Sequence, residues 1–136
     1  MTARSYLFVP GHRRRMLVKA FTLGADEVIV DLEDAVPAQD KHAARTGARE
    51  VLASHRGWVR INAVRTAAAE ADLVAVAGLA HGIRIPKVES AQDVSWVADR
   101  VPGDTMFLCA IETARGVLAA PPSPQRGVSH VWRWAG

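Results

Sequence analysis

Short runs of consecutive apolar residues recur along the chain, separated by longer segments in which polar and apolar residues mix. Continuous apolar runs of this length are typical of strands that are covered on both faces, as in a parallel sheet. We therefore predict a strand for each run. The runs cover residues 6–9, 28–30, 58–61, 83–85 and 106–111.

The segments between these runs have the spacing of helices that pack on a sheet. One segment carries apolar residues at positions i, i+4, i+7 and i+8, which share one face of a helix. These residues are Ala44, Ala48, Val51 and Leu52. A second stripe consists of Val94, Val97 and Val101. Ser90 precedes it as a helix N-cap with Asp93 as its acidic partner.

The alternation of strands with helices predicts βαβ units in a right-handed, parallel arrangement. Both an open doubly wound sheet and an α/β barrel fit it. No Gly-x-Gly-x-x-Gly follows the first predicted strand, so a dinucleotide-binding sheet loses its main support and the barrel is favoured. A complete barrel typically needs about 250 residues, and this chain has 136. We expect an α/β fold, the N-terminal part of a TIM (β/α)8 barrel with about five βα units, as one domain over residues 1–120.

Composition and charge narrow the function classes. Hydrophobic residues make up 49% of the chain, as in a globular protein. The net charge of +3 is spread along the chain, which suits an anionic substrate and gives no reason to expect nucleic acid. The single cysteine, Cys109, excludes an internal disulfide, and no apolar stretch reaches the length of a membrane span or a secretion signal. We expect a cytoplasmic protein with no nucleic-acid or membrane partner.

Three carboxylates follow the second predicted strand, where parallel barrels place their chemistry. Asp31, Glu33 and Asp34 would repel one another unless a cation, a proton or a basic group compensates them. Two interpretations stay open for this cluster. It is either a solvated turn at a helix start, or a functional cluster that forms the outer shell of a metal site or handles protons.

Polar residues at three further strands are candidates for binding. Arg60 lies within the third apolar run and needs a carboxylate, from a substrate or from the acidic cluster, because an unpaired buried guanidinium is costly. Glu112 follows the fifth run, where a carboxylate can bind a hard cation. Lys87, after the fourth run, either faces the site or caps the sheet.

Five segments match, in order and spacing, those of one known family. They are Arg-Ser-Tyr-Leu-Phe-Val-Pro-Gly at 4–11, Val-Asp-Leu-Glu-Asp-Ala-Val at 30–36, Val-Arg-Ile-Asn-Ala at 59–63, Pro-Lys-Val-Glu-Ser at 86–90 and Ile-Glu-Thr-Ala-Arg-Gly at 111–116. Over residues 4 to about 120 the chain resembles the HpcH/HpaI aldolase and citrate lyase beta-subunit family. The resemblance implies a magnesium-dependent carbon–carbon lyase that cleaves or forms coenzyme A thioesters of citryl, malyl or citramalyl type.

The resemblance also implies roles for individual residues. The arginine matching Arg60 binds the keto-acid carboxylate, and the glutamate matching Glu112 ligates Mg²⁺ and touches the substrate. Asp34, with Glu33, matches an acidic turn beside the metal's water shell. We therefore expect Arg60, Glu112 and Asp34 to be catalytic, Arg60 and Glu112 to bind the acyl-CoA or keto-acid substrate, and Glu112 to bind the metal. The full-length family implies a homo-oligomer.

Two acids implied by the family have no counterpart in this chain. One is a second magnesium ligand, an aspartate in a Gly-Ala-x-Asp-type motif after the next strand, and the other is an aspartate near the family's C-terminus that serves a neighbouring subunit. Residues 121–136 differ in composition from the preceding helices, and a shifted reading frame of the back-translated codons resembles the missing strand. We expect a frameshift near residue 120 and a truncated lyase of impaired activity.

Two other functions stay open. The first is a pyruvate-type class II aldolase on the same fold, which would share the metal and have no need of coenzyme A. The second is a non-catalytic barrel fragment that binds a ligand or pairs with another chain. The uncovered edges and apolar face of a five-stranded half-barrel favour association.

Overall fold

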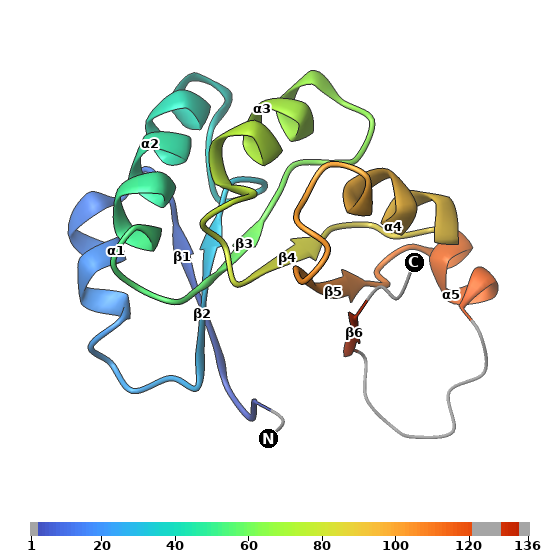
Figure 1. Cartoon of the computed structure of the whole chain (residues 1–136), viewed down its shortest axis with the longest axis horizontal. Helices are drawn as coiled ribbons and strands as arrows, with labels where there is room; N and C mark the ends of the chain where they lie inside the picture. Colours follow the sequence, from blue (N-terminus) through green and yellow to red (C-terminus); the bar gives the residue numbers. More distant parts are fainter. Residues whose placement is uncertain (1–2, 121–128, 134–136) are drawn as a thin grey trace.

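The computed structural model describes residues 3–120 and the backbone of residues 129–133. Five parallel strands alternate with helices and form one sheet in the order of the sequence (Figure 1). The strands are β1 (Tyr6–Pro10), β2 (Glu27–Asp31), β3 (Trp58–Arg60), β4 (Gly82–Ile85) and β5 (Met106–Ala110). All five predicted strands are confirmed.

The helices form an outer arc around the strands (Figure 1). They are α1 (Arg14–Ala20), α2 (Lys41–Leu52), α3 (Ala67–Val76), α4 (Ala91–Ala98) and α5 (Ala114–Ala119), with a short 3-10 turn, η1 (Ala38–Asp40), before α2. Each strand pairs with the next along the chain, whereas the strand order of an open doubly wound sheet reverses partway across. The expectation of barrel-type βα units is therefore confirmed, for the part of a barrel that the chain covers.

The two faces of the sheet bury different residues, because successive side chains of a strand point to opposite faces. One face packs against the helices in the main core, which includes Val30, Val59 and Ile83. The predicted stripe of α2 is buried there, and the stripe near α4 packs against the same core. The other face, here called the inner face, carries a smaller cluster. Its buried members are Ile29, Trp58 and Leu108, with Tyr6 and Met106 beside them.

A sixth strand, β6 (Ser129–Arg133), pairs antiparallel with β5. The sequence-based expectation of an uncovered edge at the fifth strand is therefore wrong, since the backbone of β6 supplies the partners that an edge strand lacks. Residues 121–128 and 134–136 lie outside the described part of the chain. The proposed domain limit and the frameshift near residue 120 fall largely on those residues and stay predictions. No helix in the described ranges has the length and apolarity that crossing a membrane requires.

Candidate functional site

The carboxyl ends of β2, β3 and β4 bring three charged side chains side by side on the inner face. In the register of the sheet, Asp31 lies opposite Arg60, and Arg60 lies opposite Arg84. Phe8 of β1 lies under both guanidinium groups, with the Cζ atoms of Arg60 and Arg84 at 5.1 and 5.4 Å from its ring centroid. The strand alternation therefore places a charged layer directly above the apolar cluster of the inner face.

Arg60 is held by the acidic cluster that follows β2. Its Nε donates to Oδ1 of Asp31 at 2.8 Å, and its Nη2 donates to Oδ2 at 2.6 Å. Its Nη1 lies 3.3 Å from Oε2 of Glu33. The acidic cluster therefore supplies a carboxylate partner for Arg60.

Asp31 is 1% exposed and fully engaged in hydrogen bonds. Besides Arg60, the backbone N–H groups of Glu33 and Ala35 donate to its two oxygens at 2.9 and 3.1 Å. Burial raises the pKa of Asp31, but the hydrogen bonds from Arg60 and the backbone outweigh burial and bring the pKa below its ordinary value. The hydrogen bond to Asp31 in turn raises the pKa of Arg60. This pair is charged at neutral pH.

Lys87 connects the ends of β2, β4 and β5. Its Nζ donates to Oε1 of Glu33 at 2.8 Å, and its backbone N–H donates to Oε1 of Glu112 at 3.0 Å. The hydrogen bond to Glu33 raises the pKa of Lys87. Its φ of 50° is in the left-handed region, which non-glycine residues rarely adopt outside turns and functional sites. Lys87 thus faces the site, which is the first of the two interpretations that the sequence left open.

The three acids of the cluster differ in burial and in their ion pairs. Asp31 and Glu33 are buried and compensated by Arg60 and Lys87. The side chain of Asp34 is 69% exposed, and its ion pair is a long one, 3.9 Å from Nζ of Lys87. The solvated-turn interpretation therefore fits Asp34 and does not fit the other two acids.

Glu112 lies at the exposed rim of the same edge, just after β5. Its Oε1 accepts the hydrogen bond from Lys87 described above. Within the part of the chain that the structure describes, no group of three His, Cys, Asp or Glu side chains is arranged to hold a metal ion. Glu112 therefore offers one carboxylate to a cation, without the second acid of the family's pattern.

Arg84 was missed by the reasoning from the sequence, which treated it as part of an apolar run. Its Nε is buried and has no hydrogen-bond partner among the described residues. Burial, followed by the nearby charge of Arg60, lowers the pKa of Arg84. The signal that identifies it is its strand position, since it is in register with Arg60 on the neighbouring strand.

A buried network behind the site fixes the end of β3. Asn62 donates from its side chain to the carbonyl oxygen of Leu32 at 2.9 Å and to Oδ2 of Asp72 at 2.7 Å. Asp72 is 0% exposed and accepts from Nε of Arg45 at 2.7 Å. This network joins α2, α3 and the loop after β3, and so keeps Arg60 in place from behind.

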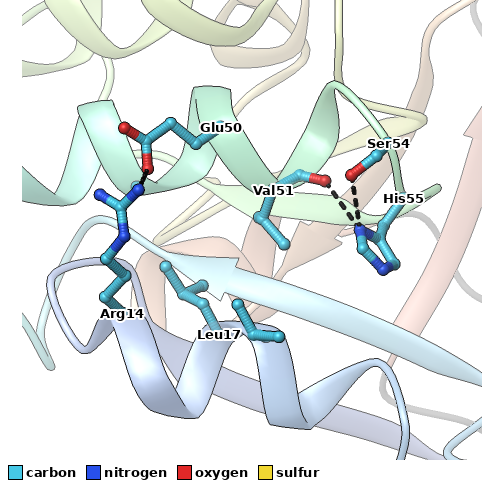
Figure 2. A pocket seen from close by; sticks show the side chains of 8 residues that line it. Arg14, Leu17, Glu50, Val51, Ser54 and His55 are labelled. Atoms are coloured by element: carbon cyan, nitrogen blue, oxygen red, sulfur yellow. Dashed lines mark hydrogen bonds and ion pairs between the residues drawn. The ribbon is translucent and has the colours of Figure 1, made fainter.

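A cavity of about 200 Å³ between α1 and α2 contains none of these residues. Among its lining residues, Arg14 of α1 pairs with Glu50 of α2, as Figure 2 shows. His55 is bonded through Nδ1 to Ser54 and to the carbonyl oxygen of Val51. The cavity lies between α1 and α2, on the helix side of the sheet and away from the charged layer.

Comparison with known proteins gives one family. The model for HpcH/HpaI aldolase/citrate lyase matches residues 4–122. A (3S)-malyl-CoA thioesterase of Cereibacter sphaeroides is 43% identical over 123 residues, which is 86% of this chain and 43% of the relative. The citrate lyase subunit beta of Escherichia coli is 36% identical over 136 residues, covering 88% of this chain and 45% of the relative. The chain thus spans less than half the length of these relatives.

Solved structures from Mycobacterium tuberculosis have the same fold. The citrate lyase beta subunit complexed with oxaloacetate and magnesium superposes with a TM-score of 0.72 at 41% identity, over 83% of this chain and 49% of that one. The protein CitE in complex with magnesium, acetoacetate and coenzyme A gives a TM-score of 0.72 at 38% identity, over 87% of this chain and 43% of that one.

Proposed function

Because the chain belongs to the HpcH/HpaI aldolase/citrate lyase family, we propose that it acts in magnesium-dependent carbon–carbon cleavage or formation of a citryl-, malyl- or citramalyl-CoA thioester. The observation that carries this proposal is the position of Glu112. Its carboxylate lies at the carboxyl edge of the sheet, linked through Lys87 to the Arg60 cluster. Related structures contain magnesium with keto acids and, in one case, coenzyme A.

The donor atoms at this edge are suited to one side of a magnesium site. Mg²⁺ prefers oxygen ligands, keeps several waters and needs only one or two carboxylates. Glu112 is the exposed acid that would hold it, with Asp34 near its waters, because Asp31 and Glu33 are occupied by Arg60 and Lys87. When bound, Mg²⁺ polarises the carbonyl oxygen of the keto acid.

Arg60 retains the capacity to bind a substrate carboxylate. A guanidinium has five N–H donors, and the two hydrogen bonds to Asp31 use two of them. The Nη1 donors face Glu33 across 3.3 Å, the longest of the three contacts of Arg60. Asp31 therefore orients Arg60, while its outer nitrogen atoms supply the proposed contact with the substrate.

Product analysis tests the proposed reaction. The chain is incubated with malyl-, citramalyl- and citryl-CoA in the presence of Mg²⁺, and acetyl-CoA and the keto acid are measured. We expect slow cleavage, because Glu112 is the one metal-ligating acid that we identify in the described residues. Absence of acetyl-CoA formation from all three esters would count against the proposal.

Thioester hydrolysis is the second candidate, since a relative at 43% identity is a (3S)-malyl-CoA thioesterase. The same assay separates the two reactions. Hydrolysis releases free coenzyme A and the intact hydroxy acid, whereas carbon–carbon cleavage releases acetyl-CoA and a 2-oxo acid, which is an aldehyde acid from malyl-CoA and a keto acid from the other two esters.

A pyruvate-type aldolase is favoured by one other observation, a related CitE structure that contains magnesium and pyruvate. This enzyme would have no use for coenzyme A. Thermal-shift measurements distinguish the two: coenzyme A thioesters stabilise an acyl-CoA lyase, whereas an aldolase responds to pyruvate and is indifferent to the thioesters.

The association state and the location of the protein stay predictions. A homo-oligomer is supported by the exposed Phe8 of the inner face, which is 41% exposed, and by the exposed apolar residues Val117 and Leu118 of α5. Size-exclusion chromatography tests the homo-oligomer. Elution as a monomer would count against it and would favour a fragment that pairs with a different chain or with no chain. The cytoplasmic location stays the prediction made from the sequence.

A further inference from the structure

Arg84 lies among the charged residues of the site, but among the described residues it takes part in none of their side-chain hydrogen bonds or ion pairs. It lies on β4 opposite Arg60, in the charged layer of the inner face. Its Nε is buried without a hydrogen-bond partner among the described side chains. A buried donor without a hydrogen-bond partner costs free energy, and a buried unpaired charge costs more. A group of this kind is therefore expected where a ligand supplies the missing partner.

The charges around Arg84 are unevenly distributed. The neighbouring cations are compensated, because Asp31 and Glu33 pair with Arg60, and Glu33 also pairs with Lys87. No ion pair joins Arg84 to an acid in the part of the chain that the structure describes. Burial and the charge of Arg60 lower the pKa of Arg84, and the charges of Glu112, Tyr6 and Asp31 offset this lowering only in part. An anion in contact with the guanidinium group would supply the missing compensation.

Phe8 holds the two guanidinium groups in a fixed relation. Both lie over its ring, at 5.1 Å for Arg60 and 5.4 Å for Arg84. Cation–π contact supports a guanidinium without using its N–H donors, so these remain for an anion. Neighbouring strands are about 4.8 Å apart. Two arginine side chains that extend from paired positions of neighbouring strands suit two carboxylates separated by a short carbon chain.

We propose that Arg84 binds the second carboxylate of a dicarboxylate keto acid, beside the first carboxylate on Arg60. This inference rests on the proposed lyase function and narrows its substrate. Of the three thioesters considered, citryl-CoA is the one whose cleavage releases a keto acid with two carboxylates. Arg84 thus selects citryl-type over malyl- and citramalyl-type substrates.

Calorimetric titration with oxaloacetate and with pyruvate, in the presence of Mg²⁺, tests this assignment. The two ligands share a keto carboxylate, and only oxaloacetate has a second carboxylate. We expect the wild-type chain to bind oxaloacetate about tenfold more tightly than pyruvate, as for a charge-assisted contact of about 1.4 kcal/mol. Arg84→Met is expected to remove this preference, because it lowers the affinity for oxaloacetate and leaves that for pyruvate unchanged. Arg84→Lys is expected to restore part of the preference.

Arg49→Met is the matched control, because Arg49 is an exposed arginine of α2 outside the site. It is expected to leave both affinities unchanged. Arg84→Met is expected to melt no lower than the wild type, since it removes a buried N–H donor that has no hydrogen-bond partner among the described residues, and this comparison verifies that the variant is folded.

The outcomes separate this inference from the proposed function. An unchanged preference for oxaloacetate in Arg84→Met overturns the role of Arg84 and leaves the lyase proposal standing. Equal weakening of both ligands also overturns it, because Arg84 would then act on the shared carboxylate. Failure of the wild-type chain to bind either keto acid overturns the inference and the proposed function together.

Discussion

Asp31 accepts four hydrogen bonds at the candidate site, two from Arg60 and two from backbone N–H groups. Asp31 thus orients Arg60, although the family resemblance gave no role to Asp31. The sequence did identify Arg60, since a charged residue within an apolar run requires a partner. It did not identify Arg84, because the runs were read as strands without assigning each side chain to a face.

Loss of Asp31 is expected to destabilise the chain strongly. Asp31→Ala leaves Arg60 buried without its main partner, and breaking a buried pair from one side typically costs about 3 kcal/mol in the free energy of unfolding. Chemical denaturation measures this difference. Asp34→Ala is the control from the same cluster, and because Asp34 is 69% exposed we expect a change of about 0.5 kcal/mol or less. Equal effects of the two variants would contradict the division of the acidic cluster.

Asp93 gives a prediction for the dependence of stability on pH. It accepts from the backbone N–H groups of Glu89 and Ser90 at 2.8 and 3.1 Å, and it pairs with Arg65. Burial raises the pKa of Asp93, but these hydrogen bonds outweigh it and lower the pKa below its ordinary value. A carboxyl with a lowered pKa stabilises the fold above its unfolded-state pKa, and the contribution is lost as the pH falls through the folded-state pKa.

We therefore expect Asp93→Asn to cost about 1.5 kcal/mol at pH 7 and progressively less below about pH 4. Denaturant unfolding of both proteins across this pH range measures the difference. A stability difference that stays constant down to pH 2 would contradict the stated hydrogen bonds of the ionised carboxylate.

At the scale of the elements, the parallel strands and the helix stripes were predictable because each depends on local periodicity. The start of α4 at Ser90 was predictable for the same reason, since Asp93 occupies the expected capping position. The antiparallel strand β6 was not predictable. Its pairing depends on the uncovered edge of β5, which is a property of the folded sheet and leaves no periodic signal in residues 129–133.

The packing of α2 on the loop after β1 depends on Gly47. A Cβ at Gly47 would collide with the backbone carbonyl oxygen of Gly11, an atom that cannot rotate away. Alanine is otherwise favoured over glycine in a helix by about 1 kcal/mol. We nevertheless expect Gly47→Ala to lower the free energy of unfolding by about 2 kcal/mol, as overpacked sites do.

Gly78→Ala is the matched control for this prediction. Among the described residues other than its two chain neighbours, no heavy atom lies within 4 Å of the position of a Cβ at Gly78, so the stability of Gly78→Ala is expected to be unchanged or slightly increased. Thermal unfolding compares the two variants. If Gly47→Ala were as stable as Gly78→Ala, the close approach between α2 and the loop would be wrong.

At the scale of the whole molecule, the chain forms barrel-type βα units with a charged layer at the carboxyl edge of its strands. It covers 43% of a malyl-CoA thioesterase and 45% of a citrate lyase subunit beta. The net charge of the chain suits an anionic substrate, and the inner face places two arginines, Arg60 and Arg84, on neighbouring strands. The positions of Lys87 and Glu112 relative to Arg60 depend on loops from three strands, so motif order alone did not give their contacts.

Glu112 is proposed to bind the metal on which acyl-CoA cleavage depends. The most direct measurement is the rate of acetyl-CoA release from citryl-CoA, with Mg²⁺ or with a chelator. Glu112→Gln is compared with Glu50→Gln, an exposed glutamate of α2 whose loss serves as the control. We predict that chelation and Glu112→Gln each lower the rate by at least about 100-fold, which corresponds to about 2.7 kcal/mol in the barrier, while Glu50→Gln keeps the wild-type rate. Cleavage that is insensitive to both magnesium and Glu112→Gln would contradict the account.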